Sequence, residues 1–150
     1  DLFARTEDRS PFVLVAFQEC DRLNILVLEI KRSLRELRSG LKGELTISPD
    51  MENLMVDIFF DKVPESWAKR AYPSLLGLQT WFIDLMMRGK ELEIWASDFV
   101  LPSSTWLAGF FNPQSFLTAI MQQTARRNEW PLDKMCLNCD VTKKQKEDLR

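Results

Sequence analysis

The sequence predicts a mainly α-helical fold: a helical layer of about five helices with a long first helix, followed by one terminal strand. Apolar residues recur at three- and four-residue steps over long stretches, as they do along the packed face of a helix. Ser-Pro and Asn-Pro pairs stand in front of three such stretches, and these pairs are typical of a helix start. A sustained period-two alternation, which indicates a strand, is found near the C-terminus.

The composition is that of an ordinary globular protein. Of the 150 residues, 45% are hydrophobic and 28% charged, and the formal net charge of −2 leaves no basic footprint for nucleic acid. No apolar run reaches the length of a membrane span, and no signal-peptide pattern follows Asp1. We therefore predict neither a nucleic-acid nor a membrane partner. Because no initiator Met is present, we expect a fragment of a longer protein.

Residue types that commonly act in catalysis or metal binding are scarce. The chain has no His, which removes the usual general base and metal ligand. Three cysteines, an odd number without an evident framework, suit a reducing compartment. Cys136 and Cys139 form a CxxC, but with only Cys20 besides them a four-ligand zinc site is incomplete. The predicted strand would also point the two thiols to opposite faces, which argues against redox chemistry.

Other motifs do not supply a catalytic site. Gly40 and Gly43 lack the spacing and the following Lys of a phosphate-binding loop. Paired carboxylates such as Asp50 and Glu52 stand where helices begin, which is typical of capping. We predict no catalytic residue, no cofactor-binding residue and no metal ligand in this sequence.

The first helix is predicted from about Pro11 to Ser39, with a length of ~43 Å. It carries a 3.5-residue apolar repeat, which is typical of helices that pack lengthwise on one another. The residues of this helix seam are Ala16, Cys20, Leu23, Val27, Ile30, Leu34 and Leu37. A self-pairing coiled coil is the alternative; the all-round apolar start, Pro11–Val15, favours the interior of a globule instead. Val13–Val15 also suit a strand.

Three shorter helices are predicted next. They run from Met51 to about Phe60, from about Val63 to Tyr72, and from about Leu75 to Trp95. Gly40 ends the first helix and Pro73 the third. The apolar stripe of the longest of the three comprises Leu75, Leu78, Phe82, Leu85, Gly89 and Leu92. A loop over residues 100–104 follows.

The segment Trp106–Arg127 is predicted to be the structural hub. Its first six residues are apolar and aromatic, so we expect them to be buried on more than one side. Asn112 and Pro113 then start a helix with a wide apolar stripe, which Arg126 and Arg127 close. The hub residues are Trp106, Phe110, Phe111, Asn112, Pro113, Phe116 and Ile120.

The C-terminal stretch changes character after Trp130-Pro131. Apolar and polar residues alternate over residues 134–142, which predicts a strand at Met135–Val141. Because a single strand is not stable by itself, its partners are expected outside this sequence. Lys143–Arg150 is a charged tail.

Six segments, in their order along the sequence, resemble the C-terminal part of a dynein heavy chain. They are Phe17–Asn24, Glu29–Leu34, Gly40–Leu45, Val63–Trp67, Arg70–Leu75 and Gly109–Ala119. The resemblance covers nearly the whole sequence and is greatest to axonemal, outer-arm, beta-type chains. It implies an origin just after, or at the end of, the sixth AAA+ module.

The resemblance implies a division of the sequence. Residues 1–10 would end the lid of the preceding AAA+ module, residues 11–133 would form the helical part of the C-terminal region, and residues 134–150 would begin its β-barrel and a polar tail. It places ATP and Mg in upstream modules of the parent protein and no cofactor here. The implied partners are other AAA+ modules of the same heavy chain and, through the parent, intermediate chains, light chains and microtubules.

Two functions from different classes follow from these observations. The first is a non-catalytic mechanical segment that braces the AAA+ ring of an ATP-driven, minus-end-directed microtubule motor. The resemblance places that motor in the cytoplasm and cytoskeleton, in the axoneme of a cilium or flagellum, where it powers beating. The alternative is an autonomous helical adaptor that docks a partner protein. An ATPase in its own right has no matching residues.

Overall fold

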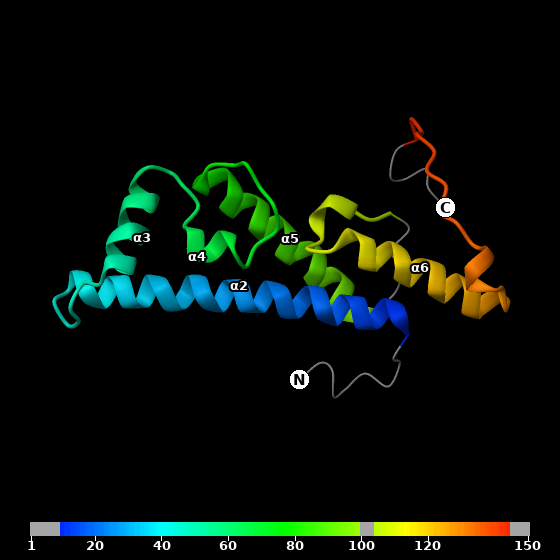
Figure 1. The fold of residues 1–150 in the computed structure, drawn as a ribbon, viewed down its shortest axis with the longest axis horizontal. Helices are drawn as coiled ribbons and strands as arrows, with labels where there is room; N and C mark the ends of the chain where they lie inside the picture. The colour runs from blue at the N-terminus through cyan, green and yellow to red at the C-terminus, as the bar shows by residue number, and fades with distance from the viewer. Residues whose placement is uncertain (1–9, 100–103, 145–150) are drawn as a thin grey trace. The chain divides into compact units, whose positions relative to one another are not determined.

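The computed structural model describes residues 10–99 and 104–144 of the protein. Within these residues five α-helices and two 3-10 turns follow one another and no strand is formed, so the predicted mainly α fold is confirmed (Figure 1). The elements are α2 (Pro11–Leu41), α3 (Pro49–Phe59), α4 (Glu65–Ala68), α5 (Leu78–Asp98), η1 (Leu107–Gly109), α6 (Pro113–Asn128) and η2 (Leu132–Lys134). None of these helices is long and apolar enough to cross a membrane.

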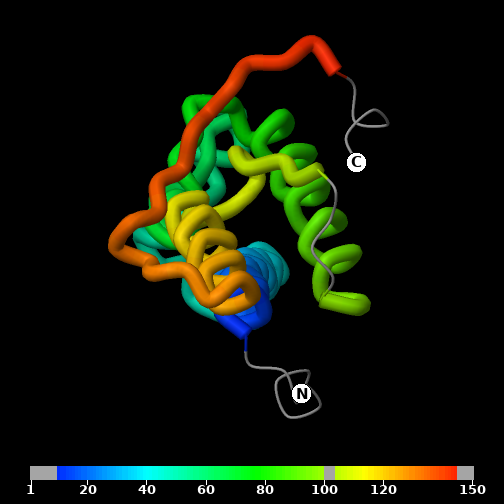
Figure 2. Tube along the Cα trace, turned by 90° about the vertical axis from the view of Figure 1, so that its right-hand side faces the viewer, coloured from blue at the N-terminus to red at the C-terminus, as the bar shows by residue number. Residues whose placement is uncertain are grey.

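The protein divides into two compact units. Unit 1 holds the described residues up to Glu19 and from Glu91 onward, and unit 2 is Cys20–Lys90. Helices α2 and α5 run through both units, so each is cut by the division. In unit 1, α6 lies beside the first turns of α2 (Figure 2). In unit 2, α3 and α4 pack along the rest of α2.

Helix α2 begins and ends close to where the sequence predicts. The Ser10 hydroxyl accepts a hydrogen bond from the Val13 N–H at 3.4 Å, and Pro11 occupies the first position. Two residues after the last helical residue, Gly43 has a φ of 78°, a left-handed conformation that glycine adopts without strain. The helix thus extends two residues beyond the predicted end at Ser39.

The inner face of α2 differs from the predicted seam by one residue at alternate positions. Its most buried row is Ala16, Glu19, Leu26, Ile30, Ser33 and Leu37, with the half-buried Leu23 between. The predicted seam placed Cys20, Val27 and Leu34 where Glu19, Leu26 and Ser33 lie. Leu34 is 40% exposed, while Cys20 and Val27 are half-buried. The prediction was wrong there because it followed apolar residues, and two of the inner positions are polar.

Helix α3 begins at a serine-proline pair as predicted. The Ser48 hydroxyl accepts a hydrogen bond from the Met51 N–H at 3.3 Å, and Pro49 is the first helical residue. Asp50 and Glu52 lie in the first turn, where the helix dipole favours negative charge. The short helix α4 carries Trp67 into the core of unit 2.

The N-terminus of α5 is capped by a residue from the turn that follows α3, on the far side of α4 in the sequence. The Asp61 carboxylate accepts a hydrogen bond from the Gln79 N–H, and its backbone carbonyl accepts one from the Leu78 N–H, both at 2.9 Å. This cap fixes the start of α5 at Leu78, three residues after the predicted Leu75, which is fully exposed.

We expect Gly77→Ala to destabilise the protein by about 1–2 kcal/mol, the usual cost of losing an N-cap. A Cβ at position 77 would collide with the Asp61 carboxylate that caps α5. The matched control is Gly89→Ala, whose Cβ would make an ordinary 3.7 Å contact with Leu23. Because alanine favours the helix over glycine, the control is expected to be stabilising by about 0.5–1 kcal/mol. Urea denaturation followed by circular dichroism tests both, and effects of the same sign would contradict this account.

The buried row of α5 also contains a polar residue that pattern reasoning missed. It comprises Trp81, Leu85, Arg88, Leu92 and Trp95, at steps of four and three. The predicted stripe contained Leu85 and Leu92 but also Phe82, which is 46% exposed. Indole rings and an arginine therefore occupy inner positions that the sequence analysis had not assigned to the core.

The predicted strand at Met135–Val141 is wrong within the described residues. Residues 135–144 have no regular secondary structure and pair with no neighbouring strand in the described part of the protein. A strand is stable only when its backbone groups bond to a neighbour, and alternation alone does not supply one. The predicted lid segment lies outside the described residues up to residue 9, as do residues 100–103 of the predicted loop and 145–150 of the charged tail.

Candidate functional site

The features that set this fold apart from a simple apolar bundle are polar side chains buried on the inner rows of α2 and α5. Glu19, Ser33 and Arg88 are each less than 10% exposed. A buried polar group is costly unless it is hydrogen-bonded, so the partners of these three residues define the joints of the structure. Each joint is described within its own unit.

In unit 1, Glu19 of α2 holds the start of α6. One carboxylate oxygen accepts a hydrogen bond from the Phe111 N–H at 2.6 Å, and the other accepts one from the Asn112 N–H at 2.9 Å. These N–H groups precede the helix, at the end of its dipole where negative charge is favoured. The Asn112 side chain in turn accepts from the Ser115 N–H at 3.2 Å. One buried carboxylate thus fixes both the position and the entry angle of α6.

An aromatic cluster lies in the same unit as this joint. Phe12 and Trp95 have ring centroids 4.6 Å apart, and Phe110 and Phe116 have theirs 4.7 Å apart. Trp95 also contacts Phe110 at 5.4 Å and Phe116 at 5.6 Å. Aromatic pairs at such distances add stability beyond their buried area. Four rings from α2, α5, the turn and α6 therefore make one core.

The predicted hub residues differ in how deeply they are buried. Phe110 and Phe116 are buried, while Phe111, Asn112, Pro113 and Ile120 are half-buried. Trp106 is 38% exposed, so the expectation that the whole aromatic turn is buried is wrong at its first residue. The indole of Trp106 instead lies against Gly109, where a Cβ would collide with it. The 3-10 turn η1 is what brings these two residues together.

In unit 2, Ser33 of α2 holds the core tryptophan of α4. The Trp67 indole N–H donates to the Ser33 hydroxyl oxygen at 3.0 Å, and that hydroxyl donates to the Glu29 carbonyl oxygen at 2.9 Å. When a serine O–H donates to a carbonyl of its own helix, the donor has a partner and the hydroxyl oxygen can still accept a hydrogen bond from another residue. Trp67 stacks on Trp81 of α5, with centroids 6.2 Å apart and planes at 22°. The joint therefore connects three helices through two indoles.

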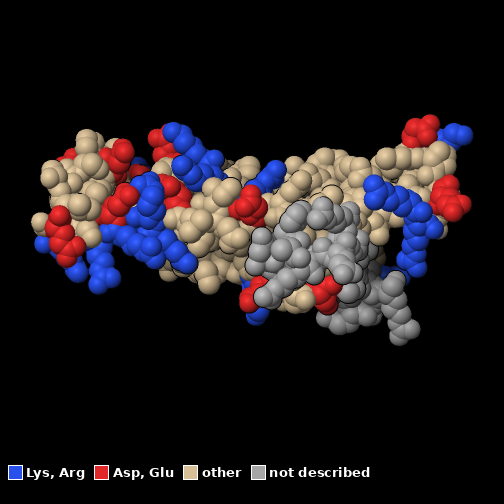
Figure 3. Space-filling view, turned by 90° about the horizontal axis from the view of Figure 1, so that it is seen from below, with Lys and Arg blue, Asp and Glu red and all other residues tan. Residues whose placement is uncertain are grey.

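An ion-pair group lies beside this joint. The Arg32 guanidinium donates to both carboxylate oxygens of Glu29, at 2.7 and 3.2 Å, and it also pairs with Glu36 at 2.7 Å. The second oxygen of Glu29 lies 3.9 Å from the Arg70 guanidinium. The hydrogen bond from Arg32 holds the pKa of Glu29 below its usual 4.5 although burial opposes the shift. On one face of the molecule, Lys and Arg side chains are interspersed with Asp and Glu in the same manner (Figure 3).

The lowered pKa of Glu29 predicts a pH dependence. Its contribution to stability is complete above the unfolded-state pKa near 4.5 and is lost as pH falls through the lower folded-state pKa. We expect Glu29→Gln to cost about 1.5–3 kcal/mol at pH 7, the range for hydrogen bonds to a charged group. The difference between wild type and variant should shrink below pH 4.5. Urea denaturation at a series of pH values measures it, and a constant difference would contradict the assignment.

Arg88 of α5 forms the third joint. Its guanidinium donates to Asp84 at 2.8 Å and lies 3.5 Å over the centroid of the Tyr72 ring. The Tyr72 hydroxyl donates to the Trp81 carbonyl oxygen at 3.5 Å. Burial raises the pKa of Tyr72 well above its usual value, and Asp84 adds to the shift, so the phenol stays protonated. The cation thus secures the loop before α5 to the helix itself.

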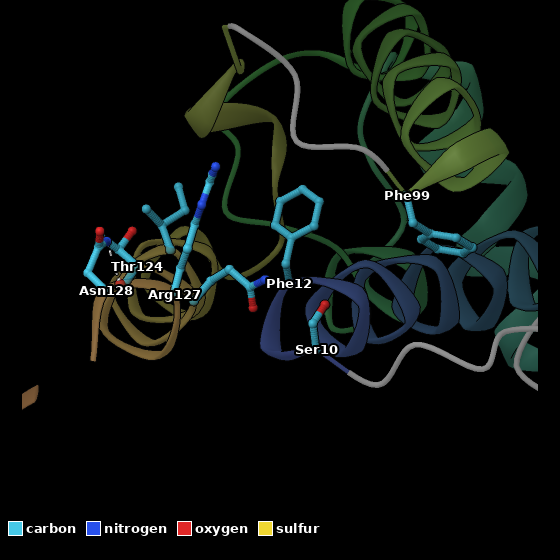
Figure 4. Close-up of a pocket in the computed structure, with 8 residues that line it drawn as sticks. Ser10, Phe12, Phe99, Thr124, Arg127 and Asn128 are labelled. Atoms are coloured by element: carbon cyan, nitrogen blue, oxygen red, sulfur yellow. Dashed lines mark hydrogen bonds between the residues drawn. The ribbon is translucent and has the colours of Figure 1, made fainter. Parts of the chain in front are cut away.

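A pocket of about 440 Å³ opens in unit 1. Thr124, Arg127 and Asn128 line it from the last turns of α6, and Phe12 lines it from the first turn of α2 (Figure 4). Its described lining residues include one cation and no His, Cys, Asp or Glu. Within the described residues no group of three potential metal ligands occurs anywhere. The described lining of this pocket combines apolar side chains with hydrogen-bonding groups, and it contains no pairing of a nucleophile with a base.

Comparison with known proteins identifies the family. The family model for the C-terminal domain of dynein heavy chains matches residues 3–150. The protein belongs to this family. The resemblance seen in the six sequence segments is confirmed, and the joints described above are joints of a dynein C-terminal domain.

Similar proteins carry dynein names. The sequence is 66% identical over 148 residues to the ciliary dynein beta chain of Tripneustes gratilla and 65% identical over 150 residues to dynein axonemal heavy chain 9 of Homo sapiens. It is 52% identical over 139 residues, 93% of its length, to the flagellar outer-arm dynein beta chain of Chlamydomonas reinhardtii. For the first two, 99% and 100% of its length is covered. The sequence spans about 3% of the length of each of these relatives.

Proposed function

We propose that this dynein C-terminal domain is a mechanical, non-catalytic segment of an ATP-driven, minus-end-directed microtubule motor of the ciliary or flagellar axoneme. It braces the ring of AAA+ modules. ATP and Mg belong to other modules of the parent protein, and the partners are those modules and, through the parent, intermediate chains, light chains and microtubules. The membership in the family and the axonemal names of its relatives support the class of motor.

The observation that carries the bracing role is the two-sided apolar character of α5. On one side Trp81 and Leu85 are buried within unit 2. On the opposite side Phe82, Ile83, Met86 and Met87 are 46–61% exposed. Exposed apolar patches of this kind mark interaction surfaces, because leaving them in water is costly. A helix with apolar residues on two opposite sides is suited to lie between its own unit and another protein body.

The buried joints support the same role. Glu19, Ser33 and Arg88 connect helices to distant segments by directed hydrogen bonds and a cation–π contact. Directed contacts hold neighbouring elements in one geometry, which apolar contacts alone specify less strictly. A segment built in this way resists bending and can therefore transmit force.

The test is a paired substitution, Ile83→Lys with Met87→Lys, in the full heavy chain. We expect slower microtubule gliding or a lower stall force, with the affinity for ATP unchanged. The matched control is Glu91→Lys with Glu93→Lys, which places two lysines at exposed polar positions of the same helix. Hydrogen exchange of α5 establishes that both variants remain folded. Unchanged motility in a folded Ile83/Met87 variant would refute the bracing role.

The adaptor alternative makes the opposite prediction for the 150 residues by themselves. An autonomous adaptor would be soluble and folded in isolation, whereas a brace that has lost its cover would aggregate through the α5 face. Analytical ultracentrifugation of these residues with and without the Ile83/Met87 substitutions separates the two functions. Aggregation that the substitutions relieve supports the brace.

A further inference from the structure

We propose that the outer edge of the apolar repeat on α2 binds an amphipathic helix with acidic flanks from another part of the same heavy chain. This inference rests on the proposed packing of the domain within the parent motor, and it adds a second contact, separate from the exposed face of α5. The predicted seam of α2 consists of two rows of apolar residues at seven-residue steps. Packing within unit 2 buries one of these rows and leaves much of the other open.

The inner row comprises Leu23, Ile30 and Leu37. Ile30 and Leu37 are less than 10% exposed, and Leu23 lies beside Gly89 of α5. This row is therefore part of the core of unit 2 and offers little surface to a partner.

The outer row comprises Val27, Leu34 and Leu41. Val27 is half-buried, Leu34 is 40% exposed, and Leu41, the last residue of α2, is 61% exposed. An apolar row with a seven-residue period is the surface that one helix presents to a second helix lying along it. Covering these side chains would remove apolar surface from water, which is favourable.

Cations border the outer row. Lys31 and Arg38 each follow a residue of that row by four positions, so they lie beside it on the helix, and Arg35 lies four positions from Lys31. All three residues are exposed, and none forms an ion pair or a side-chain hydrogen bond with a residue in the described part of the protein. Figure 3 shows Lys and Arg side chains over the C-terminal half of α2. The outer row is therefore bordered by positive charge that no described carboxylate neutralises.

The carboxylates of this part of α2 are used on another side of the helix. Glu29 and Glu36 both bind Arg32, and all three line the groove that α2 forms with α3 and α4. Charged residues beside an apolar seam determine which helices pair, so the chemistry that fits is an apolar row flanked by Asp or Glu. A second copy of this domain would bring the same cations to the contact, and like charges across a contact oppose binding. The surface therefore selects an acidic helix over self-pairing.

The length of the surface indicates a partner in the same polypeptide. The outer row is ~21 Å long, about four helical turns. A contact of this size gives weak binding between separate molecules, because association must offset the loss of translational and rotational freedom. Segments of one polypeptide meet at a high effective concentration, so a small contact suffices. The sequence spans about 3% of the length of its relatives, so a heavy chain of that length has ample room for the partner helix.

The test is carbodiimide cross-linking of the full heavy chain, which joins a lysine amine to a carboxylate in direct contact with it. Chains that migrate as a single heavy chain on a denaturing gel are digested and analysed by mass spectrometry. We expect Lys31 to be joined to an Asp or Glu of a helix outside these 150 residues. The exposed pair of Lys69 and Glu65, whose charged atoms lie 2.8 Å apart, is the internal reference. The proposal is overturned if the reference pair is joined while Lys31 stays free or is joined only within these 150 residues.

A charge reversal tests the cations. Arg35→Glu with Arg38→Glu keeps Lys31 as the reporter and reverses its two basic neighbours. We expect the yield of the Lys31 cross-link to fall about fivefold or more, since each exposed charge pair makes a modest contribution. The matched control is Lys62→Glu with Lys90→Glu, which reverses two exposed cations elsewhere in unit 2 and should leave the yield unchanged. Equal yields from the two double variants would count against a contact at this surface.

A single substitution tests the apolar row. Leu34→Gln keeps every charge, and because glutamine suits a helix nearly as well as leucine, α2 should remain folded. We expect the yield of the Lys31 cross-link to fall about threefold or more. An unchanged yield would mean that charge alone attracts the partner, and the docking of an amphipathic helix would then be wrong. Because the readout is a cross-link, its failure is distinct from a failure of the motility test on α5.

Discussion

Replacing Glu19 with alanine is expected to lower the free energy of unfolding by about 4 kcal/mol. The substitution removes the acceptor of two backbone N–H groups, those of Phe111 and Asn112, and each donor left without a partner costs about 1–3 kcal/mol. The loss is concentrated at the start of α6, where the backbone would no longer be held against α2. Urea denaturation measures the total, and hydrogen exchange of residues 111–115 measures the local part.

Two variants separate the carboxylate from the space it fills. Glu19→Gln keeps the shape and one acceptor oxygen, so we expect it to recover part of the loss but to leave one N–H facing an amide group. Glu93→Ala removes an exposed carboxylate from α5 and should change stability by less than about 0.5 kcal/mol. If Glu19→Ala leaves the exchange of residues 111–115 unchanged, the carboxylate does not hold α6.

Replacing Trp81 with alanine is expected to cost about 3–5 kcal/mol, the range for truncating a large aromatic residue in a core. Trp81 is 1% exposed and stacks on Trp67 and on Tyr72, with centroids 6.2 and 6.1 Å away. Removing it leaves a cavity between α4, α5 and the loop that carries Tyr72. The Tyr72 hydroxyl, which donates to the Trp81 carbonyl, would lose the ring that positions it.

The control for Trp81→Ala is Trp130→Ala, which makes the same chemical change at a site that is 56% exposed. Its cost should be within about 0.5 kcal/mol of zero, as for most surface substitutions. Circular dichroism is the suitable probe, because both substitutions change the fluorescence directly. Equal costs at the two sites would show that burial in unit 2 does not determine the stability of this protein.

Most helices begin where the sequence predicts because their N-terminal ends are specified by local chemistry. In three helices, the side chain just before the first helical residue accepts a hydrogen bond from a backbone N–H of the first turn. These side chains are Ser10, Ser48 and Asn112. Such caps depend on residues a few positions apart, which a sequence displays directly. The start of α5 was misplaced because its cap, Asp61, comes from 18 residues away.

The strand was also predicted from a local pattern, and the prediction was wrong because a strand depends on a non-local partner. The alternation at Met135–Val141 indicates which residues would lie on each face of a strand. It does not indicate whether a neighbouring strand is present. The buried polar residues were missed in a related way. Glu19 and Ser33 are suitable for an inner row only because a donor from elsewhere in the protein meets each of them.

The sequence by itself determined that the protein is helical, where most helices begin, and to which family it belongs. Helix period, capping and short family segments are properties of neighbouring residues. Only the tertiary structure decided which side of α2 faces inward. The Phe111 N–H reaches Glu19 across 92 residues and the Trp67 indole reaches Ser33 across 34. A polar residue is stable in a core only if a hydrogen-bonding partner lies beside it. Only the folded protein brings such a partner next to Glu19 or Ser33.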